Sequence, residues 1–267
     1  MLKKIIQMEP FQKRNDYPFN LKWLKNTPEI EFRKPLTFLV GDNGIGKSTL
    51  LQAIAIQNQI PQLTNELYEN DPEYETISRL SESLKSHWDV KSKSGFFFRA
   101  DDFISFVREN KKLRKELEED LNRLDERGVH KLAFERQPYQ NSLDALKRSY
   151  PKELHKMSHG QSFLALFKSR LTPNSLYLLD EPETPLSPQN QLTLLYMIDE
   201  QIKQGSQFII ASHSPVLTAY PDADIYNIKP ESIQLIDYEE IENVEFMKNF
   251  MADPKRFMYY TFENNHH

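Results

Sequence analysis

The sequence predicts an α/β fold: a mostly parallel sheet flanked by helices, with an N-terminal antiparallel β region and a helical insertion lobe. Three observations lead to this fold. A glycine-rich loop separates a short apolar run from a helical pattern, strand and helix patterns alternate after residue 158, and the charged stretch between these parts has helical spacing. Apolar residues make up 39% of the 267 residues, which is enough to bury a core. We therefore expect a single domain over 1–267, with the lobe at 62–150 inside it.

The first strands are short. Leu2–Gln7 and Glu29–Phe32 have the pattern of short strands that lead into an apolar run. Leu36–Val40 is too short for a helix and is bounded by a proline and a glycine, so we expect a buried strand. From Lys47 the apolar positions follow helical spacing, which ends before Pro61.

The stretch 62–150 differs from its surroundings in its dense charge and its leucines at helical spacing. Glycine and proline interrupt it several times. Its longest candidate helix, Asp101–Arg127, would extend about 40 Å at 1.5 Å per residue. We interpret the stretch as a helical lobe rather than a long coiled-coil arm.

The remaining elements alternate. A helix is expected from Ser158, a strand at Ser175–Leu179, a helix at Ser187–Gln204 and a strand at Gln207–Ala211. Serine followed by proline gives the second of these helices an N-cap and a first-turn proline. Residues 224–260 have the pattern of edge strands followed by a C-terminal helix.

Composition excludes several classes of protein. The absence of cysteine rules out disulfides and thiolate metal sites and favours a cytoplasmic location. No window approaches the roughly 18 apolar residues of a membrane span, so we expect no direct membrane insertion. A net charge of −5 does not favour a dedicated nucleic-acid binder. One local group of cations, here called the basic cluster, is followed at once by acidic residues and is interpreted as a solvated helix face; it consists of Lys111, Lys112, Arg114 and Lys115.

The strongest motif is the run Gly41-Asp-Asn-Gly-Ile-Gly-Lys-Ser-Thr49, which fits the phosphate-binding loop pattern and lies between the expected strand and helix. Its glycines let backbone N–H groups surround a phosphate, Lys47 neutralises β and γ oxygens, and Ser48 offers a hydroxyl to Mg²⁺. The run therefore predicts a site for ATP and Mg²⁺. Its candidate binding residues are Gly41, Asn43, Gly44, Gly46, Lys47, Ser48 and Thr49.

A second motif, Leu176-Tyr-Leu-Leu-Asp-Glu-Pro-Glu183, is an apolar strand that ends in carboxylates. Asp180 is expected at the carboxyl edge of the sheet, where open α/β sheets bind ligands, and is placed to hold Mg²⁺. Glu181 is placed to polarise an attacking water. Buried strands often end in acids, so the functional interpretation depends on the phosphate-binding loop.

Two shorter motifs could also contact a bound phosphate. Ser158-His-Gly-Gln-Ser162 opens a helix, so Ser158, Gly160 and Gln161 offer an anion-binding N-terminus, although Ser158 could be an ordinary N-cap. His213 follows the last expected parallel strand, where a neutral imidazole can reach a γ-phosphate or water.

In this order the four motifs resemble the ABC ATPase superfamily, and the resemblance covers Leu36–Pro215. It implies ATP hydrolysis by a homodimer in the ATP state, in which Ser158, Gly160 and Gln161 contact the γ-phosphate on the other subunit. It also implies that Glu181 is the catalytic base, that His213 is the switch histidine, and that Leu186–Pro188 crosses the dimer interface.

Finer features resemble small stand-alone bacterial ATPases related to the recombination-repair and chromosome-maintenance branch. The sequence departs from the usual motifs of the superfamily at several positions. His159 replaces a glycine of the usual signature and Met157 a leucine, while the segment Gly95–Asp101 lacks the glutamine that usually reaches Mg²⁺, with Arg99 or Asp101 as substitutes. Tyr17 and Phe19 are the candidates for stacking on adenine. The pair His155 and His159 is rejected as a metal site, because the helix begins between them.

Two functions remain open. The first is an ATPase whose dimerisation cycle drives a partner protein or a nucleic-acid process, in DNA repair or anti-phage defence. The second is the nucleotide-binding subunit of an ABC transporter, which the charged lobe disfavours. A nucleotide-gated switch with negligible turnover is a third possibility.

Overall fold

The computed structural model describes residues 1–8, 14–63, 68, 73–92, 94–130, 133–149 and 158–262. Its centre is a six-stranded sheet in the order β5-β6-β7-β3-β8-β9. All neighbours are parallel except β8 and β9, which form an antiparallel hairpin. The strands are β3 (Leu36–Gly41), β5 (Gly95–Arg99), β6 (Leu176–Asp180), β7 (Gln207–Ala211), β8 (Asp224–Lys229) and β9 (Ser232–Leu235).

A smaller antiparallel sheet, in the order β2-β1-β4, confirms the expected N-terminal β region. It consists of β1 (Leu2–Gln7), β2 (Glu29–Glu31) and β4 (Leu84–Trp88). Gln207 joins the two sheets, because its side chain accepts from the Leu2 N–H at 2.8 Å and donates to the Leu2 carbonyl at 2.9 Å.

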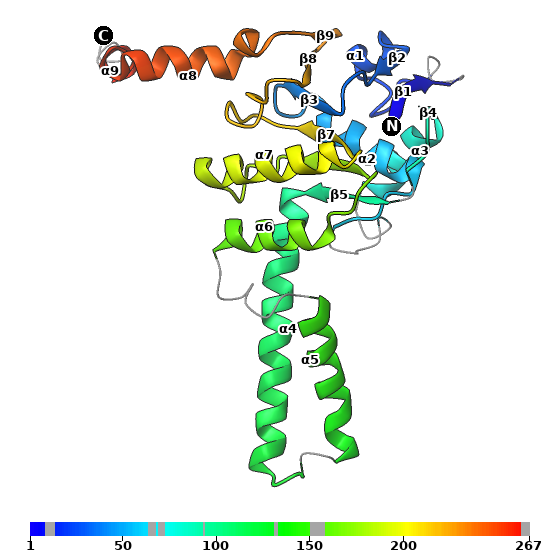
Figure 1. Ribbon diagram of the computed structural model, residues 1–267, viewed down its shortest axis with the longest axis vertical. Coiled ribbons are helices and arrows are strands. Elements are labelled where there is room, and N and C mark those ends of the chain that lie inside the picture. The colour runs from blue at the N-terminus through cyan, green and yellow to red at the C-terminus, as the bar shows by residue number, and fades with distance from the viewer. Residues whose placement is uncertain are drawn as a thin grey trace.

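Helices cover both faces of the large sheet (Figure 1). One face packs against α2 (Lys47–Asn58), α3 (Tyr74–Glu82) and the small sheet; the other packs against α6 (His159–Arg170) and α7 (Pro188–Lys203). Strand residues alternate between the two cores, as in β6, where Leu178 belongs to the first core and Leu179 to the second. This double covering explains why the parallel strands are continuously apolar.

The stretch 62–150 is only partly helical, which corrects the expectation of a helical lobe with those limits. It contains β4, which pairs with β1, and β5, which adds the outer strand next to β6. The run Phe96–Phe98 is fully buried there and is too short for a helix. The projecting part begins at Ala100 and is an antiparallel pair, α4 (Ala100–Glu126) and α5 (Gln137–Ser149).

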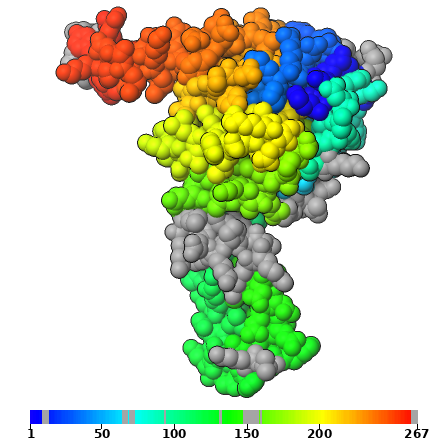
Figure 2. Space-filling model, in the orientation of Figure 1, coloured from blue at the N-terminus to red at the C-terminus, as the bar shows by residue number. Residues whose placement is uncertain are grey.

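This helical pair stands away from the sheet (Figures 1 and 2). Its small core contains Leu117, Leu124 and Leu143, and at its far end Arg136 is 4% exposed and pairs with Asp125 at 2.5 Å. The pair is therefore a lobe, as the leucine spacing predicts, but a shorter one.

The C-terminal segment forms two helices, α8 (Glu242–Ala252) and α9 (Pro254–Phe262), instead of one. The break falls at Asp253, because a proline disfavours helical backbone in the residue before it. Three short helical elements complete the described residues: α1 (Lys22–Lys25), η3 (Phe134–Arg136) and η5 (Tyr238–Glu240). In the described part of the chain no helix is both long and apolar enough to cross a bilayer.

Candidate nucleotide site

The loops that follow β3, β6 and β7 meet at one edge of the sheet. These strands are parallel neighbours, with Leu179 beside Ile210 and Leu39 beside Ala211. Their carboxyl ends therefore bring three of the predicted motifs together, from positions far apart in the sequence.

The phosphate-binding loop curls around the side chain of Lys47. Its ammonium donates to the carbonyls of Gly41 and Asp42, each at 2.8 Å. Gly46 has φ +101°, and a Cβ there would lie 2.7 Å from Leu21 Cδ1, so the turn into α2 requires glycine. Burial lowers the pKa of the Lys47 ammonium, while Glu181 and Asp180 act in the opposite direction.

Ser48 and Asp180 are in direct contact, since the Ser48 hydroxyl donates to Asp180 Oδ1 at 3.0 Å. Asp180 is 4% exposed. Burial raises its pKa to about 7, although the bond from Ser48 lowers it. A hydroxyl and a buried carboxylate at one point are oxygen ligands of the kind that Mg²⁺ prefers, so these two residues fit the metal.

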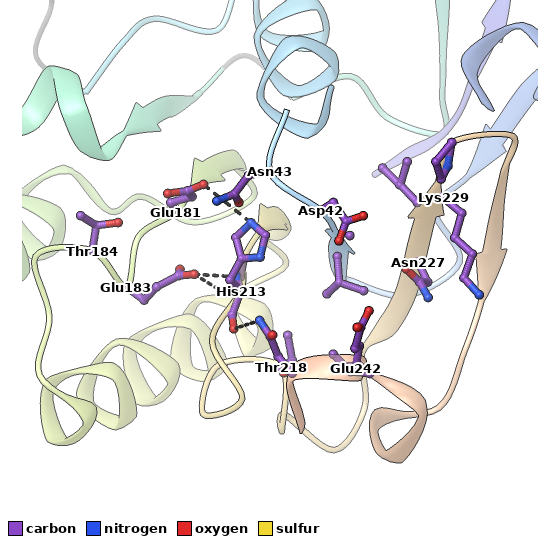
Figure 3. Close-up of a pocket in the computed structure, with 17 residues that line it drawn as sticks. Asp42, Asn43, Glu181, Glu183, Thr184, His213, Thr218, Asn227, Lys229 and Glu242 are labelled. Carbon is purple, nitrogen blue, oxygen red and sulfur yellow. Dashed lines mark hydrogen bonds and ion pairs between the residues drawn. The ribbon is translucent and has the colours of Figure 1, made fainter. Parts of the chain in front are cut away.

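Glu181 and His213 face each other across the opening of the loop (Figure 3), with His213 Nε2 3.8 Å from Glu181 Oε1. Glu181 has φ +48°, an unusual backbone for a residue with a side chain, and its N–H is held by the Ala211 carbonyl at 2.9 Å. Burial and the charge of Lys47 lower the pKa of His213. The imidazole is therefore neutral at pH 7 and can accept a hydrogen bond.

Glu183 anchors the histidine loop, a contact that sequence reasoning missed. Its Oε1 accepts from the His213 N–H at 2.7 Å and from the Ser212 hydroxyl at 2.9 Å (Figure 3). Its Oε2 is buried without a hydrogen-bond partner in the part of the chain that the structure describes. The sequence does show a second acidic residue two positions after Glu181, but it does not show which groups this carboxylate contacts.

The C-terminal segment also holds this loop. Asn243 Nδ2 donates to the His213 carbonyl at 3.2 Å, and the Tyr238 hydroxyl donates to the Pro215 carbonyl at 3.0 Å. The start of α8 thus belongs to the wall of the site.

Two hollows flank the loop. The larger, about 760 Å³, lies between Asn43, His213, Lys229 and Glu242 (Figure 3). The smaller, about 160 Å³, lies along Gly44–Thr49 and includes Glu181. Most of the residues that line both hollows have polar side chains, which suits a charged ligand.

Ser158, Gly160 and Gln161 line neither hollow. Ser158 and Gln161 form a reciprocal capping box, with both bonds at 3.3 Å. Gly160 packs against the loop before α7, where a Cβ would lie 2.7 Å from the Pro185 carbonyl oxygen. One chain therefore does not bring this motif to its own phosphate-binding loop. Met157, His155 and the side chain of His159 lie outside the described residues.

The candidates for contacts with adenine and Mg²⁺ differ in burial and in position. Phe19 is fully buried, so it is a core residue and cannot stack on adenine. Tyr17 is 43% exposed and lies beside the loop, with its hydroxyl 2.6 Å from Thr49 Oγ1. Arg99 pairs with Asp102 at 2.8 Å and lies beside Asp180 in the register of β5 and β6, whereas Asp101 is exposed.

Comparisons with solved structures find distant similarities. The chain is similar to cbiO1 from Clostridium perfringens, part of the ABC transporter complex cbiONQ, at 17% identity over 95% of this chain and 96% of that chain, with a TM-score of 0.45. It is similar to the Smc head domain of Pyrococcus furiosus at 14% identity over 95% and 99%, with a TM-score of 0.41. It is also similar to the bacterial ABC transporter cassette MJ0796 at 14% identity over 77% and 86%, with a TM-score of 0.40.

No curated protein matches the chain. The sequence model of the ABC transporter family matches residues 32–184, which include the phosphate-binding loop and Asp180. Because this match covers more than half of the chain, the protein belongs to the ABC transporter family and carries its ATP-binding and ATP-hydrolysing domain.

Proposed function

We propose that the chain is a Mg²⁺-dependent ATPase whose site is completed by a second copy, and that the cycle of closure and release drives a partner protein. The separation of two motifs supports this proposal. In this proposal Lys47 contacts the β-phosphate, and Ser48 and Asp180 hold Mg²⁺ beside it. The start of α6 at Ser158 lies outside both hollows.

Each residue has a defined role in this proposal. Gly41, Asn43, Gly44, Gly46 and Thr49 shape the loop whose N–H groups and helix N-terminus receive the phosphates. Ser48 and Asp180 would hold Mg²⁺, which when bound neutralises charge on the β and γ oxygens.

Glu181 orients and deprotonates the attacking water, and His213 donates to or accepts from the γ-phosphate region. In the transition state, charge on the γ oxygens requires further donors. The partner's helix start at Ser158, Gly160 and Gln161 supplies them. Hydrolysis then depends on association of two copies.

The paired helices α4 and α5 favour a protein over a nucleic acid as the driven partner. Within α4, three cations pair with acids one turn away: Lys112 with Glu116, Arg114 with Glu118 and Lys115 with Glu119. Three of the four cations of the basic cluster thus lie beside acids on their own helix, which weakens the attraction of the cluster for phosphates.

The test uses Glu181→Gln, which keeps the ATP site and removes the base. This variant should form a dimer with Mg-ATP but not with ADP, as measured by light scattering during size-exclusion chromatography. Adding Ser158→Arg should abolish that dimer and leave ATP binding by the monomer nearly unchanged. Ser169→Arg, an exposed change on the same helix, is the matched control. A monomeric Glu181→Gln protein at saturating Mg-ATP would refute the shared site.

The same preparation tests the driven partner. Turnover should change little when DNA is added, because the basic cluster is paired. Stimulation by DNA at physiological salt would favour a nucleic-acid process instead.

A further inference from the structure

A cation, Arg99, lies directly beside Asp180 at the edge of the large sheet. Arg99 is the last residue of β5 and is paired in register with Asp180, the last residue of β6. Strand residues two positions apart point to the same face. Phe97 and Leu178, two positions earlier, both belong to the core on the α2 side of the sheet, so Arg99 and Asp180 also point to that side. The two side chains therefore start next to each other, from strands about 4.8 Å apart.

The helix that follows the phosphate-binding loop contacts both of these residues. Ser48, in the first turn of α2, donates to Asp180 Oδ1 at 3.0 Å. Gln52, four residues later on the same face of α2, is 2% exposed and accepts from Arg99 Nη1 at 3.5 Å. Arg99 thus contacts α2 one turn, about 5.4 Å, beyond the hydroxyl that is proposed to bind Mg²⁺.

Asp102 fixes the orientation of the Arg99 guanidinium. It accepts from Arg99 Nε at 3.0 Å and from Arg99 Nη2 at 2.8 Å, so the ion pair is bidentate. The Arg99 side chain is 26% exposed. The guanidinium is therefore held at the edge of the sheet without being enclosed, and a ligand bound at this edge can reach it.

The chemistry of arginine points to a phosphate as that ligand. A guanidinium carries only N–H donors, so it cannot ligate Mg²⁺, but its planar fork binds phosphate oxygens as it binds a carboxylate. Charge that develops on the γ oxygens in the transition state requires donors of this kind. Asp101, the other candidate in this segment, is exposed, and its negative charge is unsuited to a phosphate.

We infer that Arg99 is a further catalytic residue, whose guanidinium donates to the γ-phosphate of ATP bound in its own chain. In the sheet, β6 with Asp180 lies between β5 with Arg99 and β3, which leads into the phosphate-binding loop. Lys47 and Arg99 therefore approach the Asp180 carboxylate from opposite sides, and a phosphate beside Mg²⁺ would lie between two cations. The inference rests on the proposed function, because it requires ATP at this loop.

Nucleotide affinities separate a contact with the γ-phosphate from a structural role. The parent protein for this test carries Glu181→Gln and Ser158→Arg, so that it should bind ATP without hydrolysing it and without forming a dimer. Adding Arg99→Ala should weaken Mg-ATP binding about tenfold in titration calorimetry, because a charge-assisted contact is lost. Mg-ADP binding should stay within about twofold, because ADP has no γ-phosphate.

Arg114→Ala is the matched control for Arg99→Ala. Arg114 is also on α4, its side chain is 25% exposed, and it also pairs with an acidic residue, Glu118. This variant should change neither affinity. Equal losses of Mg-ATP and Mg-ADP affinity in Arg99→Ala would overturn the inference, because Arg99 would then act only through Asp180 or through the fold. Unchanged Mg-ATP affinity would also overturn it. A parent protein that binds neither nucleotide would instead refute the proposed function, and this inference with it.

Turnover in the otherwise unchanged chain tests the catalytic role. Arg99→Gln keeps most of the side-chain length and can still donate to Asp102, but it removes the charge, so kcat should decrease about a hundredfold. Arg99→Lys keeps the charge without the fork and should recover part of that loss. Thermal unfolding checks that both variants are folded. Wild-type kcat in Arg99→Gln would overturn the inference, since the reaction would then not need a cation at this position.

Discussion

Removing the Glu183 carboxylate tests whether the position of the histidine loop limits hydrolysis. Glu183→Ala deletes the acceptor of two bonds, from the His213 N–H at 2.7 Å and from the Ser212 hydroxyl at 2.9 Å. A buried donor left without a partner costs about 1–3 kcal/mol. Removal of the unpartnered Oε2 offsets part of that cost.

The ordered conformation of the histidine loop should therefore lose about 1.5–3 kcal/mol of stability relative to its other conformations. This corresponds to a decrease in kcat of about tenfold to a hundredfold. Affinity for ATP should stay within about threefold, because the loop that holds the β-phosphate keeps its contacts at Lys47. Phosphate release in steady state gives kcat, and titration calorimetry gives the affinity.

Glu183→Gln is the matched control, since its amide oxygen can still accept both bonds, and its kcat should stay near that of the wild type. The His213 imidazole resonances, assigned with His213→Gln, should shift in Glu183→Ala and not in Glu183→Gln. Wild-type kcat in Glu183→Ala would refute the reasoning. If His213→Ala also hydrolysed ATP normally, the role of the histidine itself would be wrong.

Four further predictions concern charge. Lys47→Ala should weaken ATP binding by about tenfold or more in calorimetry, because a charge-assisted contact to phosphate contributes about 1.5–3 kcal/mol; unchanged affinity would refute the phosphate-binding role. The pKa of Asp180 is raised to about 7, so protons compete with Mg²⁺ for this carboxylate below pH 7. The affinity for Mg²⁺ should therefore increase as the pH rises through 7. The Asp180→Asn substitution should abolish this pH dependence. Because of the same raised pKa, the folded state binds more protons than the unfolded state between pH 3.8 and about pH 7. The nucleotide-free protein should therefore lose stability as the pH rises through this range. At pH 8, thermal unfolding should show that the Asp180→Asn protein is more stable than the wild type. Neutralising the basic cluster should leave ATP affinity unchanged, and a loss of ATP binding in that variant would contradict its remote position on α4.

The loops at the sheet edge could be predicted because their chemistry is local. A strand that ends at Gly41 and a helix that starts at Lys47 fix the phosphate-binding loop by themselves, and the strand ending in Asp180 lies beside it by the rules of parallel sheets.

Contacts between distant segments could not be predicted in this way. The pairing of β1 with β4 and the bond from Asn243 to His213 join residues far apart in the chain, and neither leaves a periodic pattern. β5 was missed because its short aromatic run lies inside a charged stretch whose helical spacing dominated the interpretation.

Because β5 continues directly into α4, a rotation at their junction would move the whole helical pair about a point beside Asp180. Arg99, the last residue of β5, lies beside Asp180, and α4 begins at the next residue without a linker. The 27 residues of α4 extend about 40 Å. A rotation of about 5° at Ala100 therefore moves the far end by about 3–4 Å, given that helix length. Displacements too small to disturb the packing around Asp180 thus become displacements of atomic size at the far end of the lobe.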